Sequence, residues 1–129
     1  MDLIVFDLDG TLLNRSSVIS DYTRDTLALL GQHDIAYTVA TGRTLHAARD
    51  LIQDHGFDLP HIYKNGVVIW SPHQEGYTHS YLLTQDEIAH ILHAFIAEHT
   101  TPFIFTLEHG DRHAIYHSPL LNDVERELV

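Results

Sequence analysis

The stretch LIVFDLDGTL, residues 3–12, decides the fold that the sequence predicts. Its first four residues form a continuous apolar run rich in β-branched side chains, which is typical of a strand buried on both faces of a parallel sheet. An acidic turn that contains a glycine follows directly. The sequence therefore predicts a buried strand over residues 3–6 that ends at two carboxylates.

Helix and strand patterns alternate after this turn. Apolar residues between Ser20 and Gly31 recur at helical spacing, and a mostly apolar run of strand character follows them. The predicted order is helix 21–33, strand 35–40, turn 41–43, helix 44–55 and strand 61–64. This alternation indicates an α/β architecture with right-handed crossovers, in which functional residues lie at the carboxyl ends of the strands.

The pattern changes from residue 65 onward. Turn residues between two strand-like segments indicate a hairpin, and a capping-box sequence then opens a helix. We expect strands at 67–70 and 77–83, a helix from residue 84 to about 99, paired strands at 103–107 and 113–117, and weak structure over the last ten residues. The predicted organisation is a core over residues 1–80 and a second domain over residues 81–129.

Composition narrows the class of partner. The chain has 129 residues, 44% of them hydrophobic, which is enough for one compact domain but short for two complete ones. Seven Lys plus Arg against eighteen Asp plus Glu give a formal net charge of -11, which opposes binding to nucleic acid or an anionic membrane and favours a small-molecule partner. The absence of cysteine and of any long apolar run predicts a soluble, cytoplasmic protein.

Two carboxylates, Asp7 and Asp9, leave the first strand two residues apart, and this placement predicts a site for Mg2+. Mg2+ binds carboxylate and carbonyl oxygens together with phosphate oxygens of a substrate. Asp7 is placed to attack a phosphoryl group and form an aspartyl-phosphate, and Asp9 to act as acid and base. Gly10 lets the backbone approach a phosphate, and Thr11 offers a hydroxyl donor.

Two motifs carry a resemblance to a known family. DLDGTLL at residues 7–13 resembles the first motif of phosphatases of the haloacid dehalogenase (HAD) superfamily, and VATGR ending at Arg43 resembles the second. The resemblance implies that Thr41 binds the phosphoryl group. Gly42 and Arg43 match the TGR form of the Cof-like branch and are expected at the phosphate site, with a solvated cation at the start of a helix as the alternative for Arg43. Asn65 belongs to a KNG element that resembles the third-strand element of this branch, so it is expected to face the active site.

The resemblance is to the N-terminal portion of such a phosphatase. It implies a partial Rossmann-like core, with a parallel sheet and flanking helices, followed by the beginning of an α/β cap domain that selects the substrate. Family members continue with a phosphate-stabilising lysine and an acidic motif for magnesium, and neither is found in this sequence. The metal site would then lack part of its acidic ligands, and residues 3–6 would form an apolar edge strand, which predicts self-association or poor stability.

Other interpretations stay open at this level. An Asp-x-Asp after a strand is often only a polar turn. The histidines include His90 and His93 on one helix turn, but they lack a matching pattern of further ligands and are expected on the surface. The predicted function is hydrolysis of a small phosphorylated metabolite. The alternatives are a truncated, catalytically impaired chain that binds metal or phosphate, and a chain whose site a second polypeptide completes.

Overall fold

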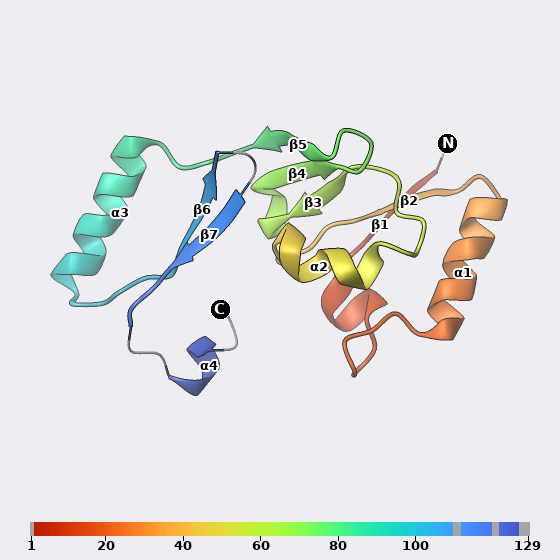
Figure 1. Cartoon of the computed structure of the whole chain (residues 1–129), viewed down its shortest axis with the longest axis horizontal. Helices are drawn as coiled ribbons and strands as arrows, with labels where there is room; N and C mark the ends of the chain where they lie inside the picture. Colours follow the sequence, from red (N-terminus) through yellow and green to blue (C-terminus); the bar gives the residue numbers. More distant parts are fainter. Residues whose placement is uncertain (1, 110–111, 120–121, 127–129) are drawn as a thin grey trace. The chain divides into compact units, whose positions relative to one another are not determined.

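The computed structural model describes residues 2–109, 112–119 and 122–126. The chain divides into two compact units, Met1–Leu82 and Leu83–Val129. In the described part, the first unit contains a parallel strand pair, a three-stranded antiparallel sheet and two long helices (Figure 1). The second contains one long helix, a two-stranded hairpin and a short helix.

A short parallel sheet underlies the first unit. Strand β1 (Leu3–Phe6) pairs in parallel with β2 (Ala36–Val39) along its whole length. The next strand, β3 (His61–Tyr63), continues the parallel order through a bridge between Ala40 and Ile62. The three strands therefore direct their carboxyl ends toward the same edge of the sheet, and the predicted α/β architecture is confirmed.

Both long helices of the first unit begin at a hydroxyl side chain. Helix α1 (Asp21–Gln32) is capped by Ser20 and helix α2 (Leu45–Ile52) by Thr44, and each cap accepts a backbone hydrogen bond from the first turn. Such caps satisfy amide groups that have no partner within the helix. Helix α2 is shorter than the predicted segment 44–55, because the chain turns soon after it. Both helices lie beside the β1–β2 pair (Figure 1).

The predicted hairpin extends β3 into an antiparallel sheet. Strand β4 (Val68–Ser71) pairs with β3 on one side and with β5 (Gly76–Ser80) on the other. The prediction that the last strand runs to residue 83 is wrong. The backbone N–H of Tyr81 still donates to the carbonyl oxygen of Val67 at 2.7 Å, and beyond it the chain leaves the sheet and enters the second unit.

The hydrophobic core lies in the first unit. Its side chains come from the turn after β1, from both long helices and from β2, β3 and β4 with their connections. In the described chain the buried hydrophobic residues are Leu8, Leu12, Leu13, Leu27, Val39, Leu45, Ala48, Ile52, Phe57, Tyr63 and Val68. Because burial of a large aliphatic side chain contributes about 1.5–3 kcal/mol, the three leucines after β1 anchor the turn that carries the acidic motif.

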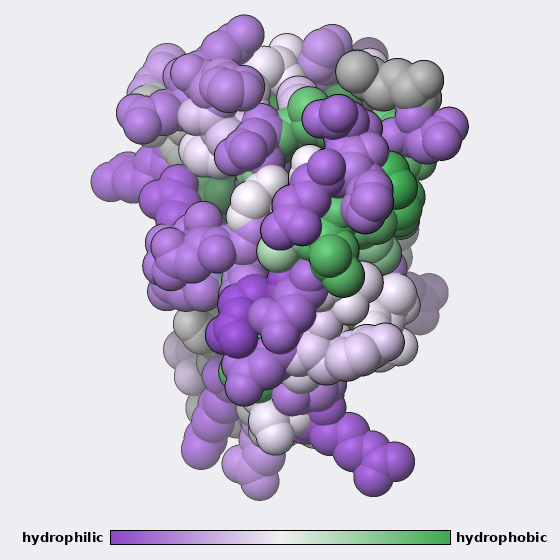
Figure 2. All heavy atoms as spheres, turned by 90° about the vertical axis from the view of Figure 1, so that its right-hand side faces the viewer, coloured by the Kyte–Doolittle hydropathy of each residue, from purple (hydrophilic) through white to green (hydrophobic). Residues whose placement is uncertain are grey.

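The prediction that β1 is buried on both faces is wrong. Leu3 and Val5 are 57% and 49% exposed, whereas Ile4 and Phe6 are partly buried. Side chains of a strand alternate between two faces, and the described elements of the first unit cover only one of them. Figure 2, which faces the side of the molecule that carries α1, shows hydrophobic side chains at the surface among polar ones. Within the described residues β1 pairs with β2 alone, so it is also an edge strand.

The second unit opens with the predicted capping box. The side chain of Thr84 accepts from the backbone of Glu87, whose own side chain accepts from the backbone of Thr84. The described elements are α3 (Gln85–Ala97), β6 (Ile104–Glu108), β7 (Arg112–Tyr116), which pairs antiparallel with β6, and α4 (Asp123–Arg126). Residues 110 and 111 of the predicted turn between β6 and β7 lie outside the described residues, as do five of the last ten residues.

Helix α3 keeps its apolar stripe exposed. Ile88 and Ile91 are each 41% exposed and Ile96 is 69% exposed, and α3 has no buried residue. An amphipathic helix gains most of its stability from the packing of such a stripe, so the stability of the described chain resides mainly in the first unit. The stripe does not mark a bilayer-spanning segment, since no helix in the described ranges is long and apolar enough to cross a membrane.

A buried histidine links β3 to the segment that precedes it. His61 is 4% exposed, its Nε2 lies 2.9 Å from the carbonyl oxygen of Phe57, and its Nδ1 lies 3.0 Å from the hydroxyl of Tyr63. Because a carbonyl only accepts, this network assigns the proton to Nε2 and lets Nδ1 accept from Tyr63. Burial lowers the pKa of His61, although the Phe57 carbonyl and the charge of Asp58 oppose the shift. The folded state therefore favours the neutral ring.

We expect the stability of the chain to fall as the pH drops below about 6.5, the ordinary pKa of histidine. The unfolded chain then binds a proton that folded His61 resists, so the free energy of unfolding decreases by up to about 1.4 kcal/mol per pH unit until the folded pKa is reached. Urea unfolding from about pH 7.5 to pH 5 measures this slope. His61→Gln should lose this part of the slope, whereas the exposed control His33→Gln should retain it; equal slopes in all three proteins would contradict the assignment.

Candidate active site

Asp7 is the first residue after β1 and lies at the carboxyl end of that strand. Its side chain is exposed, and its Oδ1 accepts a hydrogen bond from the backbone N–H of Leu8 at 2.8 Å. Leu8 is fully buried, so the core fixes the backbone immediately after Asp7 while the carboxylate faces solvent. A carboxylate whose backbone is held in place and whose oxygens face solvent is suited to act as a nucleophile or as a metal ligand.

The turn Leu8–Leu12 depends on Gly10. Asp9 has φ -75° and ψ 124°, and Gly10 has φ 74° and ψ 1°. These are the central conformations of a type II turn, which requires a positive φ at its second central residue and therefore favours glycine there. The backbone N–H of Leu12 donates to the carbonyl oxygen of Asp7 at 3.2 Å. This hydrogen bond brings the chain back to Asp7, so the side chain of Asp9 lies at the same end of the sheet as that of Asp7.

Thr41 is the second residue after β2, and Asp7 is the first residue after β1. The backbone N–H of Ala40 donates to the carbonyl oxygen of Phe6 at 2.8 Å, which carries the parallel pairing to the end of both strands. Thr41 is 4% exposed, and its Oγ1 accepts from the backbone N–H of Arg43 at 3.2 Å. We call residues 7–12 the acidic turn and residues 41–43 the threonine turn. Because adjacent parallel strands end at the same edge of a sheet, these two turns start side by side.

A bidentate ion pair joins these two turns. Arg43 Nε donates to Asp9 Oδ2 at 2.8 Å, and its second terminal nitrogen, Nη2, donates to Asp9 Oδ1 at 2.7 Å. Nη1 donates to the carbonyl oxygen of Ala47 at 3.2 Å. The hydrogen bonds from Arg43 hold the pKa of Asp9 below its ordinary value against the opposing effect of burial, and the same contact raises the pKa of Arg43. Asp9 is therefore ionised at neutral pH, in the form that accepts a proton.

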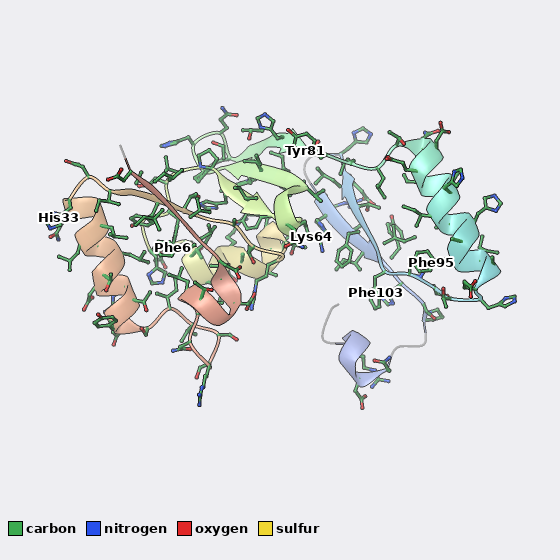
Figure 3. The ribbon with its side chains drawn as sticks, turned by 180° about the vertical axis from the view of Figure 1, so that it is seen from behind. Phe6, His33, Lys64, Tyr81, Phe95 and Phe103 are labelled. Atoms are coloured by element: carbon green, nitrogen blue, oxygen red, sulfur yellow. The ribbon has the colours of Figure 1, made fainter. Side chains whose placement is uncertain are left out.

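The turn after β3 consists of residues in the left-handed region and closes on the threonine turn. Lys64, Asn65 and Gly66 have φ values of 50°, 56° and 94°. A left-handed backbone costs an ordinary residue roughly 1–2 kcal/mol, and glycine and asparagine tolerate it best. Two backbone hydrogen bonds hold the turn in place, from Asn65 N to the carbonyl of Thr41 at 3.1 Å and from Lys64 N to the carbonyl of Arg43 at 3.0 Å. Figure 3 labels Lys64 in this turn.

Gly42 leaves room for the side chain of Asn65. A Cβ placed on Gly42 would lie 3.2 Å from Asn65 Oδ1, so any larger residue would press on that amide. Hydrogen bonds and close packing connect five of the predicted site residues: Asp9, Thr41, Gly42, Arg43 and Asn65. Asp7 follows Phe6, whose strand pairs with β2. Gly10 shapes the acidic turn, whereas Thr11 is exposed and joins this set through no hydrogen bond within the described residues.

The carboxylates of Asp7 and Asp9 are the donors available to a divalent cation. Mg2+ usually keeps several waters and takes one or two protein carboxylates together with substrate phosphate oxygens, and this small donor set fits that requirement. In residues 2–109, 112–119 and 122–126, no group of three or more His, Cys, Asp or Glu side chains is placed to hold a metal ion. Since both oxygens of Asp9 contact Arg43, Asp7 is the more accessible carboxylate.

Sequence reasoning missed the contact between Arg43 and Asp9, because it considered only phosphate or solvent as the partner of Arg43. A signal for the contact was present, because Asp9 and Arg43 each lie three positions beyond the end of their predicted strands, residues 3–6 and 35–40, and the two strands were expected to be neighbours. The choice between a carboxylate and a phosphate as the partner of the guanidinium depends on the side-chain conformation. The sequence pattern does not encode that conformation.

A parallel sheet whose adjacent strands end in an acidic turn and a threonine turn defines an α/β protein with a polar site at the carboxyl ends of its strands. The chain belongs to the haloacid dehalogenase-like hydrolase family, whose model matches residues 4–128. The family that the two motifs predicted is confirmed.

Two curated phosphatases are similar to part of the chain. The 5-amino-6-(5-phospho-D-ribitylamino)uracil phosphatase YwtE of Bacillus subtilis (strain 168) is 40% identical over 77 residues, which span 60% of this chain and 25% of that protein. The HMP-PP phosphatase of Enterobacter sp. (strain 638) is 41% identical over 69 residues, which span 54% of this chain and 25% of that protein. The matched segments span about a quarter of the length of these relatives.

Solved structures share the fold over most of the chain. A haloacid dehalogenase-like hydrolase from B. subtilis superposes with a TM-score of 0.73 at 28% identity and covers 99% of this chain and 41% of its own. The HAD subclass IIB sugar phosphatase BT4131 superposes with a TM-score of 0.70 at 24% identity and covers 89% of this chain and 44% of its own. The second likeness shows the fold alone.

The ion pair between Asp9 and Arg43 is expected to contribute little to folding. The side chains are 55% and 28% exposed, and pairs of this kind contribute about 0.2–1 kcal/mol, less at high salt. A double-mutant cycle of Asp9→Asn and Arg43→Gln, measured by urea unfolding, should give a coupling energy in that range. The more exposed pair of Asp21 and Arg24 on α1, at 2.9 Å, is the control and should give a smaller value. A coupling energy near 3 kcal/mol would instead mark the pair as a structural element.

Proposed function

We propose that this chain is the N-terminal part of a magnesium-dependent phosphatase that acts on a small phosphorylated metabolite through an aspartyl-phosphate on Asp7. The observation that supports it best is the meeting of the acidic and threonine turns at one edge of the sheet, with Asp9 held across them by Arg43. A carboxylate nucleophile, a second carboxylate and donors for phosphoryl oxygens are the groups that this chemistry needs.

In the first half of the proposed reaction a carboxylate oxygen of Asp7 forms a bond to phosphorus. The bond between phosphorus and the leaving oxygen breaks, and its electron pair stays on that oxygen. Asp9, which takes up a proton from solvent when substrate binds, supplies this proton to the leaving oxygen. Thr41 and Arg43 offer a hydroxyl and a guanidinium to the phosphoryl oxygens, and Asn65 lies against the same turn.

In the second half a water molecule attacks the phosphorus of the aspartyl-phosphate. Asp9, now a carboxylate, takes a proton from this water, the bond between phosphorus and the Asp7 oxygen breaks, and phosphate leaves. The depressed pKa of Asp9 in the free protein suits this base role. Asp7 is then a free carboxylate again, and Asp9 releases its proton to solvent to return to the carboxylate of the free protein.

Asp7 would hold Mg2+, with Asp9 as the second acidic residue of the same turn. When bound, the ion offsets the negative charge of the phosphoryl oxygens and of the attacking carboxylate. The exposed position of Asp7 leaves space for the waters that Mg2+ retains.

The curated relatives support a small phosphorylated substrate, since one is a 5-amino-6-(5-phospho-D-ribitylamino)uracil phosphatase and another an HMP-PP phosphatase. The formal net charge of -11 is also unfavourable for a nucleic-acid partner. Residues 81–129 are proposed as the beginning of a cap domain over a core of residues 1–80. A cytoplasmic location stays a prediction from the absence of cysteine.

A second candidate is a chain that binds magnesium or phosphate without turnover, or that turns over only when a second polypeptide completes its site. The observation that favours it is that the match to each curated relative spans 25% of that relative. Lys64 is the single lysine of the sequence. Its own turn packs against the threonine turn, and burial lowers its pKa.

Asp7→Asn should abolish metal-dependent release of phosphate from an aryl phosphate by the purified chain. Asparagine keeps the shape of the side chain but lacks the carboxylate nucleophile, so we expect a loss of at least about a thousandfold. Asp50→Asn, on the exposed surface of α2, is the control and should keep the rate. A wild-type rate in Asp7→Asn would reject Asp7 as the nucleophile, and a folded wild-type chain without turnover would favour the second candidate.

Self-association through β1 also stays a prediction. The strand pairs with β2 alone in the described chain and exposes Leu3 and Val5, and an unpaired apolar edge invites pairing with another chain. Analytical ultracentrifugation should therefore detect dimers or larger species. Val5→Lys places a charge on this strand and should shift the distribution toward monomer; a wild-type chain that is monomeric at every concentration tested would reject the prediction.

A further inference from the structure

The guanidinium of Arg43 has two kinds of partner. Nη1 donates to the carbonyl oxygen of Ala47 at 3.2 Å, a contact to the helix that follows the same turn. Nε and Nη2 donate to the two carboxylate oxygens of Asp9 at 2.8 and 2.7 Å, a contact between two different turns. The Asp9 side chain is 55% exposed, twice the fraction of Arg43, so a ligand reaches the pair from the side of Asp9.

A phosphoryl group and the Asp9 carboxylate compete for the same donors. The planar guanidinium presents parallel N–H groups that match a carboxylate or a phosphate equally well. Asp7 and Asp9 place negative charge at the strand ends, so an incoming phosphate needs a cationic partner there. Arg43 is already held at that edge by Ala47 and needs only to exchange one anion for another.

We propose that Arg43 exchanges its bidentate contact from Asp9 to the phosphoryl group when substrate binds, and that this exchange frees the Asp9 carboxyl to turn toward the leaving oxygen. Arg43 is then a positioning residue for Asp9 in the free protein and a phosphate ligand in the complex. The hydrogen bond to Ala47 keeps the guanidinium in place during the exchange. This inference rests on the proposed phosphatase function and couples the binding of phosphate to the release of Asp9.

A binding experiment at constant pH, with inorganic phosphate as the probe and Mg2+ present, tests the exchange. The Nε–Hε resonance of Arg43 in a proton–nitrogen NMR spectrum, assigned by its loss in Arg43→Lys, reports the guanidinium directly. We expect this resonance to shift as phosphate is added to the wild-type chain. Asp9→Asn removes the competitor and should tighten phosphate binding by about two- to fivefold, as expected for a partly exposed ion pair.

Arg43→Lys provides the matched background, because lysine keeps the charge but cannot form the bidentate contact. Asp9→Asn should tighten phosphate binding more in the Arg43 background than in the Arg43→Lys background. Asp50→Asn, which removes one negative charge from the surface of α2, should have the same small effect in both. An equal effect of Asp9→Asn in the two backgrounds would overturn the exchange, as would a resonance that phosphate moves in neither the wild type nor Asp9→Asn.

Turnover is measured separately, so the two failures are distinguishable. Suppose that phosphate release depends on Asp7 but Asp9→Asn has an equal effect on phosphate binding in both backgrounds. The phosphatase function would then be supported and the exchange rejected. The expected binding cycle in a folded chain that releases no phosphate would support the exchange and reject turnover by this chain.

Discussion

The parallel pairing of β1 with β2 is the constraint on which the candidate site depends. The hydrogen bond from Ala40 N to the carbonyl of Phe6, at 2.8 Å, carries this pairing to the last residues of both strands, so the turns that follow begin next to each other. Antiparallel strands would place the acidic turn and the threonine turn at opposite edges. The buried side chains of Leu8 and Val39, both 0% exposed, tie these strand ends to the core of the first unit.

Opposite charges and two residues with a left-handed backbone, Lys64 and Asn65, lie at this edge. The acidic turn brings carboxylates close together, and the guanidinium of Arg43 offsets the charge of one of them, Asp9. The third turn holds Lys64 and Asn65 in the left-handed region, and its backbone amides donate to carbonyls of the threonine turn. Strained backbone persists where surrounding structure holds it and is frequent at functional sites. The three turns therefore support one another, and Asp7 stays open to solvent among them.

Sequence reasoning succeeded where the signal is local. The capping residues Ser20, Thr44 and Thr84 each open the predicted helix, because a cap acts on amides within the next few residues. It failed on the burial of β1, since an apolar run shows that a strand can be buried but not which faces other elements cover. It also failed on the end of β5, because the last pairing, at Tyr81, is decided by the position of the neighbouring strand.

The sequence by itself determined the order of helices and strands, the family, and the residue types at the strand ends, because periodicity, capping and short motifs act over a few neighbouring residues. Only the tertiary structure decided that Arg43 takes both oxygens of Asp9, that Asn65 lies against Gly42, and that one face of β1 is exposed. The residues of the ion pair are 34 positions apart. Contacts of this kind depend on strand register, side-chain conformation and the elements that pack on each face, and these exist only in the folded chain.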